Sequence, residues 1–375
     1  MPRILIINIE HPPVGGGAGY ASQTIAYGLS RNYHYQFDII TMGMPNLPKI
    51  QTINSKIKIY RLNCWRTHQY SSQPWQQCIF LIKAFFLGLK LMKKKHYAFC
   101  HAHFIVPCGF LAYVFHHIKN LKYIISTHGS DVPGYNPKKF KMLHFLLKPW
   151  EKRIIKKSQL LLAPSNYLKS LIQTNILNYP VKIIPSGVRD VNQSQVKKEK
   201  IILTAGRLVK HKGIDYLIKA FIKLRNPNWR LVIIGDGPEK KALQKIATGQ
   251  SNISFTGWLD RKSIKYQKYF NQAAIFALPS SSESQGLVYF EAMSTRCAIV
   301  ALKNGASLEF LNQIGVLVEP ENIIQRLTNV LKKLVRKPKI RKKFSNLARQ
   351  SYEQNFTHSL ILEKYAKIYS HIIKP

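Results

Sequence analysis

Acidic residues are the scarcest chemical class in this chain. Its 375 residues include 17 Asp and Glu against 57 Lys and Arg, which gives a formal net charge of +40 at pH 7. A surface with so few carboxylates attracts polyanions, such as nucleic acid, an anionic lipid leaflet or a phosphorylated substrate. Net charge alone does not choose among these three.

Cysteine is also sparse, and its five copies are scattered without a C-x-x-C pair. This spacing argues against a disulfide framework and a zinc site, and it suits a reducing cytosol. Residues 2–8 have the pattern of a buried strand rather than of a signal peptide. The longest apolar run, residues 78–92, contains two lysines and is too short and too charged to span a bilayer. We therefore expect a cytoplasmic protein.

The length of the chain and its 46% apolar content suit two domains rather than one. In the first half, short apolar runs alternate with longer amphipathic runs. Strands are expected at 4–9, 37–41, 99–103, 123–127 and 159–163, and helices at 20–32, 79–95, 140–157 and 166–175. This alternation predicts a parallel sheet with helices on both faces.

The alternation starts again after a charged connector at 197–200. Strands are expected at 201–205, 230–234, 253–256, 274–278 and 298–301, and helices at 214–224, 240–248 and 285–295. We predict an α/β protein with two Rossmann-like, doubly wound domains, residues 1–187 and 188–355, followed by a C-terminal helix at 356–375. Ligands of such sheets bind outside the carboxyl ends of the strands, so the domains are expected to face a common cleft.

Two loops of the first domain contain candidate ligand-binding residues. The glycine-rich segment 15–19 follows the first strand and opens a helix, where amides and the helix dipole favour an anion. Its spacing is not the dinucleotide fingerprint, and a tight strand-to-helix turn is the alternative. His128 follows the strand at 123–127 and stands beside Gly129. It either hydrogen-bonds a ligand hydroxyl or belongs to a structural turn.

The second domain offers a pair of cations. Arg207 and Lys212 stand five residues apart in the loop after the strand at 201–205. A planar guanidinium together with an ammonium group is a plausible clamp for a diphosphate. In so basic a chain, two cations in one loop mean little by themselves.

The sharpest feature is an acidic pair. Glu283 and Glu291 stand eight residues apart across Gly286, which is expected to begin a helix. Glu283 would meet sugar hydroxyls from the loop, and Glu291 would accept both hydroxyls of a ribose. The amides of Gly286 and Leu287 would point at a phosphate from the helix start. The simpler alternative is one loop carboxylate and one carboxylate on a helix surface.

Together these motifs resemble glycosyltransferase family 4, in the family's order and over nearly the whole chain. The matching segments are 15–19, Thr127-His128-Gly129-Ser130-Asp131, Pro185-Ser186-Gly187-Val188, Gly206-Arg207-Leu208 with Lys212-Gly213, Ile234-Gly235-Asp236-Gly237-Pro238, Phe255-Thr256-Gly257, and the Glu283 and Glu291 pair with Ala292-Met293. The ensemble is far more specific than any one member. Residues 10–13 and 128–137 look like those of bacterial members that build surface polysaccharides.

The resemblance implies a GT-B fold and a retaining transfer from a nucleoside diphosphate sugar, with UDP or GDP as the nucleotide. It also implies that no metal or other cofactor is bound, and the absence of a D-x-D triplet agrees with this. The last helix would cross back to the first domain.

Roles are implied for matching residues of the second domain. Arg207 and Lys212, in the loop that Gly206 opens, would neutralise the leaving diphosphate. Glu291 would hold the ribose. Glu283, with the amides of Gly286 and Leu287, would hold the donor sugar.

The matching residues of the first domain are implied to act on the sugar side. His128 would touch the donor sugar, and Asp131, which ends the same motif, would bind the substrate. Gly16 and Gly17 would leave room for the donor phosphate and the acceptor. The implied acceptor is a lipid-linked or membrane-embedded glycan, such as a lipopolysaccharide or exopolysaccharide precursor.

A basic amphipathic segment at 138–157 predicts contact with an anionic membrane. It contains eight Lys and Arg and one Glu, interleaved with Trp150 and other apolar residues. The alternative is that its apolar stripe is the core face of a domain helix, and both can hold. A second basic run at 336–343 adds to this pattern. We expect a peripheral protein on the inner face of the cytoplasmic membrane.

Alternatives remain at the sequence level. Arg296 and Ala298 stand where family members usually have Gly and Pro, so an inactive homologue or an epimerase with the same fold is one alternative. A basic nucleic-acid-binding protein is another. The chain has no helix-turn-helix, RNP-type or zinc-finger pattern, and its basic residues are spread throughout, so no nucleic-acid partner is expected.

Overall fold

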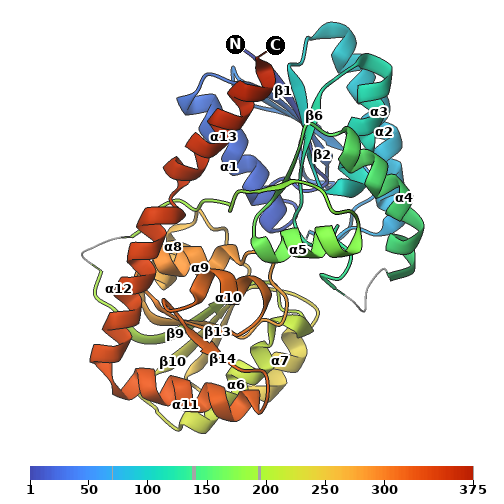
Figure 1. Ribbon diagram of the computed structural model, residues 1–375. Coiled ribbons are helices and arrows are strands. Elements are labelled where there is room, and N and C mark those ends of the chain that lie inside the picture. The colour runs from blue at the N-terminus through green and yellow to red at the C-terminus, as the bar shows by residue number, and fades with distance from the viewer. Residues whose placement is uncertain (70, 137–140, 193–195, 375) are drawn as a thin grey trace. The chain divides into compact units, whose positions relative to one another are not determined.

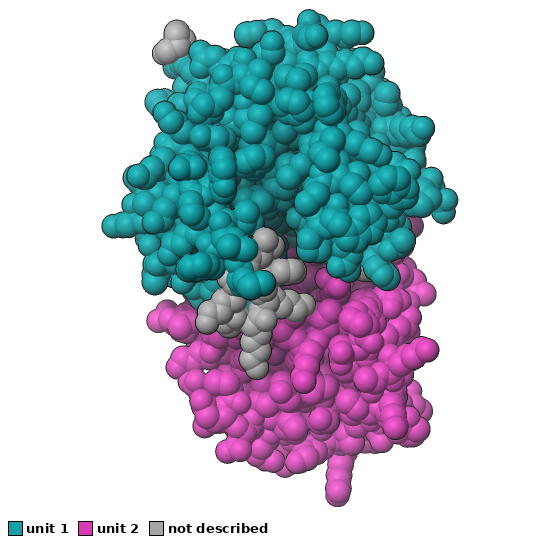
Figure 2. Space-filling model, turned by 90° about the vertical axis from the view of Figure 1, so that its right-hand side faces the viewer, with its two compact units in different colours: residues 1–186, 359–375 teal, residues 187–358 magenta. Residues whose placement is uncertain are grey.

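A computed structural model describes residues 1–69, 71–136, 141–192 and 196–374. The chain divides into two compact units (Figures 1 and 2). Unit 1 contains Met1–Ser186 together with Ser359–Pro375, and unit 2 contains Gly187–His358. The start of the expected basic segment, Lys138, Lys139 and Phe140, lies outside the described residues, as does Pro137.

Unit 1 is built on a sheet in which the first strand lies near the middle. The described strands follow the order β3-β4-β2-β1-β5-β6-β7-β8, and neighbours are parallel except β3 and β4. Their bounds are β1 Arg3–Ile7, β2 Gln36–Met42, β3 Ile50–Asn54, β4 Ile57–Leu62, β5 Phe99–His103, β6 Tyr123–Ser126, β7 Leu160–Ala163 and β8 Val181–Ile183.

Helices cover both faces of this sheet because its central strands are apolar on both sides. Leu5 and Ile7 of β1 belong to the core beneath α2, α3, α4 and α5, whereas Ile4 and Ile6 belong to the core beneath α1 and α13. The helix bounds are α1 Gly17–Asn32, α2 Pro74–Lys94, α3 Phe110–Lys119, α4 Lys141–Lys157, α5 Asn166–Asn175 and α13 His358–Ile373.

Unit 2 repeats this plan with a fully parallel sheet. The described order is β11-β10-β9-β12-β13-β14. The strand bounds are β9 Glu199–Ala205, β10 Arg230–Ile234, β11 Ile253–Gly257, β12 Ala273–Leu278, β13 Ala298–Leu302 and β14 Val316–Val318.

The helices of unit 2 also pack on both sheet faces. Leu203 of β9 faces the core of α8, α9, α10 and α12, and Ile202 faces the core of α6, α7 and α11. Their bounds are α6 Ile214–Leu224, α7 Lys240–Ile246, α8 Ile264–Gln272, α9 Leu287–Ser294, α10 Gly305–Leu311, α11 Ile323–Arg336 and α12 Pro338–Asn355. The prediction of two α/β domains with mainly parallel sheets is confirmed.

Helix α2 is longer than the sequence pattern predicted. It begins at Pro74, whose fixed φ suits the first helical turn, and the Gln73 amide donates to Oε1 of Gln76 at 2.8 Å. An apolar pattern does not reveal this polar start. The complete helix has 21 residues and an 18-residue window of mean hydropathy 1.3, which satisfies the length and composition of a membrane span. The apolar run 78–92 was expected to be too short and too charged to span a bilayer, but the whole helix is long and apolar enough to do so.

Close packing nevertheless holds α2 on unit 1. A Cβ atom added at Gly88 would lie 2.2 Å from Cζ of Phe115 in α3, so only glycine allows the two helices to approach this closely. Phe80, Ala84 and Leu91 are buried on the same side of α2. These contacts are typical of a helix that lies on a sheet, and they would be lost if α2 left the unit.

A column of three imidazoles, of which His101 and His103 are fully buried, connects β5 and β6 to α13. Nδ1 of His101 lies 2.6 Å from the hydroxyl of Tyr369, and its Nε2 lies 2.8 Å from Oγ of Ser126. The rings of His101 and His103 stack with centroids 4.4 Å apart, and Nδ1 of His103 lies 2.9 Å from Nε2 of His128. Burial lowers the pKa of His101 and of His128 to about 3, so both rings are neutral at pH 7.

This column predicts that unit 1 loses stability in mild acid. An unfolded histidine has a pKa of about 6.5, so below that pH the unfolded state binds more protons than the folded state. At pH 5.5, His101 and His128 should each lower the free energy of unfolding by about 1.4 kcal/mol relative to pH 8. Urea denaturation at both pH values measures this difference.

Matched histidine variants provide the control. His101→Gln should reduce the pH dependence of the unfolding free energy by about 1.4 kcal/mol, whereas His371→Gln, on the exposed side of α13, should leave it unchanged. An identical pH dependence in wild type and His101→Gln would mean that burial of this ring does not control acid stability.

Candidate functional site

The candidate site of unit 2 lies where β9 pairs with β12. The chain leaves β9 for β10 on one side of the sheet, while β12 lies on the other side and leads to β13. In an open parallel sheet such a reversal of strand order leaves a crevice outside the carboxyl ends. The loop after β9 contains Gly206, Arg207 and Lys212, and the loop after β12 contains Glu283 and Gly286. The topology therefore brings these predicted residues to one edge of the sheet.

Glycine allows the loop after β10 to pack against the loop after β9. A Cβ atom at Gly235 would lie 1.9 Å from the carbonyl oxygen of Gly206, and one at Gly237 would lie 2.4 Å from that of Leu208. Both glycines have a positive φ, 139° and 158°. The Gly235-Asp236-Gly237 segment thus supports the cation-bearing loop through backbone packing.

An ion pair joins the two loops of this site. Nζ of Lys212 lies 2.5 Å from Oε1 of Glu283, and both side chains are largely buried. The backbone joins the same loops, because the Ser281 amide donates to the His211 carbonyl at 2.8 Å. Sequence reasoning gave Lys212 and Glu283 separate tasks, but the structure places them in direct contact. Arg207 is exposed on the same loop as Lys212.

Gly286 sets the start of α9. Its φ is 77°, in the left-handed region, and a Cβ atom there would lie 2.4 Å from Cδ2 of Tyr289. The hydroxyl of Tyr289 donates to the carbonyl of Leu278 at 2.8 Å, which fixes the helix on β12. The first amides of a helix, here from Leu287 onward, have no intrahelical acceptor, and the helix dipole favours an anion at this end.

Two partners hold the carboxylate of Glu291 inside unit 2. Its Oε1 lies 3.2 Å from Nη1 of Arg261, and its Oε2 accepts a hydrogen bond from the hydroxyl of Tyr266 at 2.8 Å. Burial raises the pKa of Glu291, while Arg261 and Tyr266 act in the opposite direction. Each carboxylate oxygen can accept more than one hydrogen bond, so the ionised group can still receive ligand hydroxyls.

Sequence reasoning missed Arg261 and Tyr266. Tyr266 lies on α8, 25 residues before Glu291, and Arg261 precedes that helix. In a chain with 57 Lys and Arg, nothing in the sequence marks this arginine as different. The amphipathic pattern of α8 indicates a buried face, but it does not identify the residue that Tyr266 contacts.

An acidic side chain occupies the glycine-rich loop of unit 1. The Gly16 amide donates to Oε2 of Glu10 at 2.8 Å. Gly15 has a φ of 95°, and a Cβ atom there would lie 2.4 Å from Cβ of Glu10. Gly16 and Gly17 are exposed at the start of α1. A phosphate contact through the Gly16 amide therefore requires that Glu10 move away.

Asp131 turns into its own loop. Its Oδ1 accepts hydrogen bonds from the amides of His128 and Gly129, each at 3.0 Å, and its Oδ2 accepts one from the Ile105 amide at 2.9 Å. The residue is 6% exposed. In these contacts Asp131 joins the loops after β5 and β6 and fixes the position of His128, whose Nε2 in turn contacts His103. Asp131 thus holds the backbone of His128 in place, and its predicted role in substrate binding stays a prediction.

The predicted site residues form two groups, each at the carboxyl ends of one sheet. In unit 1, Gly16 and Gly17 lie at the start of α1, and His128 and Asp131 follow β6. In unit 2, the residues follow β9, follow β12 or lie on α9: Gly206, Arg207, Lys212, Glu283, Gly286, Leu287 and Glu291.

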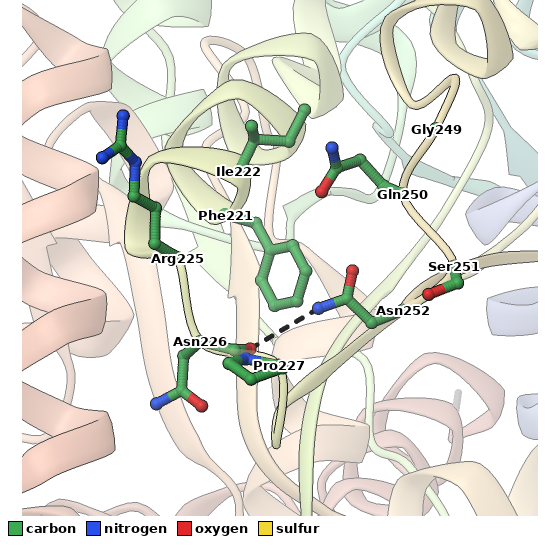
Figure 3. A pocket seen from close by; sticks show the side chains of 9 residues that line it. All are labelled: Phe221, Ile222, Arg225, Asn226, Pro227, Gly249, Gln250, Ser251 and Asn252. Carbon is green, nitrogen blue, oxygen red and sulfur yellow. Dashed lines mark hydrogen bonds between the residues drawn. The ribbon is translucent and has the colours of Figure 1, made fainter.

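A separate hollow of about 280 Å³ lies at the opposite edge of the unit 2 sheet (Figure 3). It lies between the end of α6 and the loop before β11, so it faces the amino ends of the strands. Arg225 is the charged member of its lining, and Asn252 donates to the Trp229 carbonyl at 3.1 Å. This hollow is distinct from the group of Arg207, Lys212 and Glu283.

Family models match consecutive parts of the chain. The model described as Glycosyltransferase Family 4 matches residues 15–190, and the model described as Glycosyl transferases group 1 matches residues 189–351. The boundary between the matches coincides with the boundary between the two units.

Individual relatives agree with these models. The uncharacterized glycosyltransferase MJ1607 of Methanocaldococcus jannaschii is 28% identical over 356 residues, which cover 85% of this chain and 86% of the relative. The putative teichuronic acid biosynthesis glycosyltransferase TuaC of Bacillus subtilis is 27% identical over 254 residues, which cover 62% and 61% of the two chains.

Solved structures show the same fold. Sucrose-phosphate synthase from Thermosynechococcus elongatus superposes with a TM-score of 0.83 at 18% identity, over 99% of both chains. Anabaena HepE, solved in complex with UDP and glucose, superposes with a TM-score of 0.76 at 17% identity, over 99% of this chain and 100% of that one. With its two α/β domains and both family matches, the chain belongs to the GT-B glycosyltransferases of the family 4 type.

Proposed function

We propose that this glycosyltransferase moves a sugar from a nucleoside diphosphate sugar to a lipid-linked or membrane-embedded glycan. The observation that supports this most is the arrangement in unit 2, where cations, paired carboxylates and a helix start meet at the carboxyl ends of β9 and β12. A diphosphate needs cations and amides, whereas a ribose and a sugar need hydrogen-bond acceptors. This group of residues offers both kinds of contact.

Arg207 and Lys212 would neutralise the diphosphate as it leaves. Arg207 is exposed, and the ion pair with Glu283 fixes the position of the Lys212 ammonium group. Fixed charges at the site of developing negative charge are the most effective electrostatic contribution to catalysis. Together with the family resemblance, this pair supports a retaining reaction without a metal or other cofactor.

Glu291 would accept the ribose hydroxyls, and Glu283 would contact the donor sugar. Arg261 and Tyr266 orient Glu291, so its carboxylate loses little conformational freedom when a ligand binds. The amides of Gly286 and Leu287 would face the donor from the start of α9. Anabaena HepE was solved with UDP and glucose, which supports a nucleotide sugar, with UDP or GDP as its nucleotide.

In unit 1, His128 would contact the donor sugar as a neutral ring, because burial lowers its pKa to about 3. A neutral imidazole offers one donor and one acceptor nitrogen, and Nε2 is already engaged by His103. Gly16 and Gly17 would admit the donor phosphate and acceptor after Glu10 leaves the loop.

The proposed acceptor lies in the cytoplasmic membrane, so the protein would act as a peripheral protein on its inner face. Helix α4 supports this because one side is buried through Ile154 and Ile155, while Phe145, Leu146 and Trp150 are exposed. The similarity to TuaC, a teichuronic acid biosynthesis glycosyltransferase by name, supports a cell-surface polysaccharide. The second basic run, residues 336–343, spans the end of α11 and the start of α12 in unit 2.

Arg296 is compatible with activity. It has a φ of 59°, the left-handed conformation for which family members use glycine, and the Cys297 amide still closes the turn on the Ala292 carbonyl at 2.9 Å. The turn leads into the amino end of β13, away from the carboxyl ends that carry the site. Ala298 is the buried first residue of that strand. These observations favour a transferase over an inactive homologue.

A thermal-shift panel of UDP, GDP, ADP, CMP and their sugar conjugates tests the proposal. It is run with EDTA and at about 0.3 M salt, where nonspecific anion binding is screened. Stabilisation by one nucleotide, increased by one attached sugar, is the expected result and identifies the donor. No stabilisation by any nucleotide would support the inactive homologue.

The raised pKa of Glu291 predicts that nucleotide binding depends on pH. The carboxylate protonates at a higher pH than an ordinary glutamate, so affinity should fall as the pH is lowered through that raised value. Glu291→Gln should weaken binding at pH 8 by about 10- to 100-fold and abolish this pH dependence. Calorimetric titration at pH 8 and 5.5 measures both effects. Glu321→Gln, on the exposed surface of unit 2, is the matched control; unchanged affinity in Glu291→Gln would remove this residue from the site.

The two cations should be essential for turnover. The combined change Arg207→Gln and Lys212→Gln should lower the rate of nucleoside diphosphate release from the donor by at least ~100-fold. Lys240→Gln, which breaks the exposed pair with Asp236, should have little effect. Melting temperatures of both variants separate a catalytic loss from unfolding. A folded double variant that retains wild-type turnover would contradict the diphosphate clamp.

A further inference from the structure

Negative charge is missing from the exposed surface of a long stretch of unit 1. Residues 39–186 contain 22 Lys and Arg, and their acidic residues are Asp131 and Glu151. Both are buried, with 6% and 1% exposure. The exposed formal charges of this stretch are therefore cationic, which suits contact with an extended anionic surface rather than with a single anion.

Helix α2 adds an exposed apolar stripe to this cationic surface. Trp75, Ile82 and Phe86, here called the α2 stripe, are 52%, 61% and 65% exposed. Their spacing of seven and four residues places them on one side of the helix. Lys90 and Lys93 continue the same side toward the C-terminal end. Such a helix, apolar along its length and cationic at one end, is typical of a membrane interface.

Exposed apolar residues continue from α2 across the neighbouring helices. Helix α3 contacts both α2 and α4, and all three contribute to the core on one face of the sheet, so their exposed sides point away from that face. Figure 2 views this side of unit 1. Of seventeen exposed large apolar side chains in the described chain, nine lie between residues 65 and 150: Trp65, Trp75, Ile82, Phe86, Ile118, Met142, Phe145, Leu146 and Trp150.

A lysine-rich hollow lies at the end of the same helices. It has a volume of about 510 Å³ and is lined by Lys93, Lys94 and Lys95 at the C-terminal end of α2 and by Lys119 and Lys122 at the C-terminal end of α3. Lysines at helix C-termini also offset the helix dipoles, so the hollow alone does not define a ligand. Lys93, which lies on the same side of α2 as the α2 stripe, is one of its lining residues, so the hollow adjoins the stripe.

We propose that α2 docks in the plane of an anionic phospholipid membrane. The α2 stripe would enter the boundary between headgroups and acyl chains, and the lysines at its end would contact headgroup phosphates. The helix lies in this plane rather than across the bilayer, because Gly88 packs on Phe115 and the opposite side of α2 is buried. This inference deepens the proposed function, since it rests on an acceptor that is held in a membrane, and it adds α2 to the contact suggested for α4.

Vesicle flotation of the 375-residue protein tests whether the α2 stripe binds an anionic membrane. Wild type should float with vesicles of phosphatidylcholine and phosphatidylglycerol at about 0.1 M salt, and much less with phosphatidylcholine alone. The combined change Ile82→Gln and Phe86→Gln, which leaves α4 and every lysine intact, should lower the partition coefficient by at least ~10-fold. Ile50→Gln with Ile264→Gln, two exposed residues outside α2–α4, should leave partitioning unchanged.

A dye on α2 provides a second measurement that needs no destabilising change. Cys78 is exposed, whereas Cys64, Cys100, Cys108 and Cys297 are buried, so a thiol-reactive, polarity-sensitive fluorophore attaches to this helix. Its emission should shift to the blue with phosphatidylglycerol vesicles and not with phosphatidylcholine vesicles. An unshifted emission on vesicles that do bind the protein would show that α2 stays in water and would overturn the proposal.

Other occupants of the surface give different outcomes. Equal flotation of wild type and the double variant would mean that charge alone binds the vesicle. A wild-type dimer that the double variant converts to a monomer, with unchanged flotation, would assign the stripe to a second copy of the chain. Thermal shift by the donor nucleotide, measured without vesicles, keeps the two proposals apart. Nucleotide binding without flotation overturns only the membrane surface, and flotation without nucleotide binding overturns only the transfer reaction.

Discussion

The direct pairing of β9 with β12 is the constraint on which the site of unit 2 depends. These strands lie far apart in the chain, yet their carboxyl ends meet at one edge of the sheet. The loops that follow the two strands can therefore form the ion pair between Lys212 and Glu283, and Gly286 starts α9 in the same loop as Glu283. Because the sheet is parallel and covered by helices on both faces, this edge is one of the places where polar loops can gather.

The scarcity of carboxylates shapes the whole molecule. Several of the few acidic residues serve internal contacts instead of the surface. Asp38 accepts from the Tyr97 hydroxyl at 2.7 Å and pairs with Lys95, Asp131 binds three backbone amides, and Glu291 is held by Arg261 and Tyr266. Buried carboxylates require such partners because an unpaired charge in a protein interior is costly. As a consequence, the exposed surface of much of unit 1 is cationic, which suits contact with polyanions.

Sequence reasoning succeeded where a local pattern determines the structure. The helix expected at 166–175 is α5, and the strand expected at 99–103 is β5, because apolar periodicity and a serine cap act over neighbouring residues. It missed the hairpin of β3 and β4, since β3 is mostly exposed and lacks a buried apolar face. It also placed the start of α2 too late, because Pro74 and the hydrogen bond between Gln73 and Gln76 begin that helix, and neither belongs to the apolar pattern.

Strand–helix alternation and ordered motifs are local properties of the chain, so they were sufficient to predict the α/β class, the family and the residue types at the site. The tertiary structure was needed to establish which side chains meet. It placed Lys212 against Glu283, put Arg261 and Tyr266 on Glu291, and turned Asp131 into its own loop. Except for the contacts of Asp131 within its own loop, these contacts join segments from different strands and helices, and they depend on sheet order and close packing, which no spacing along the chain specifies.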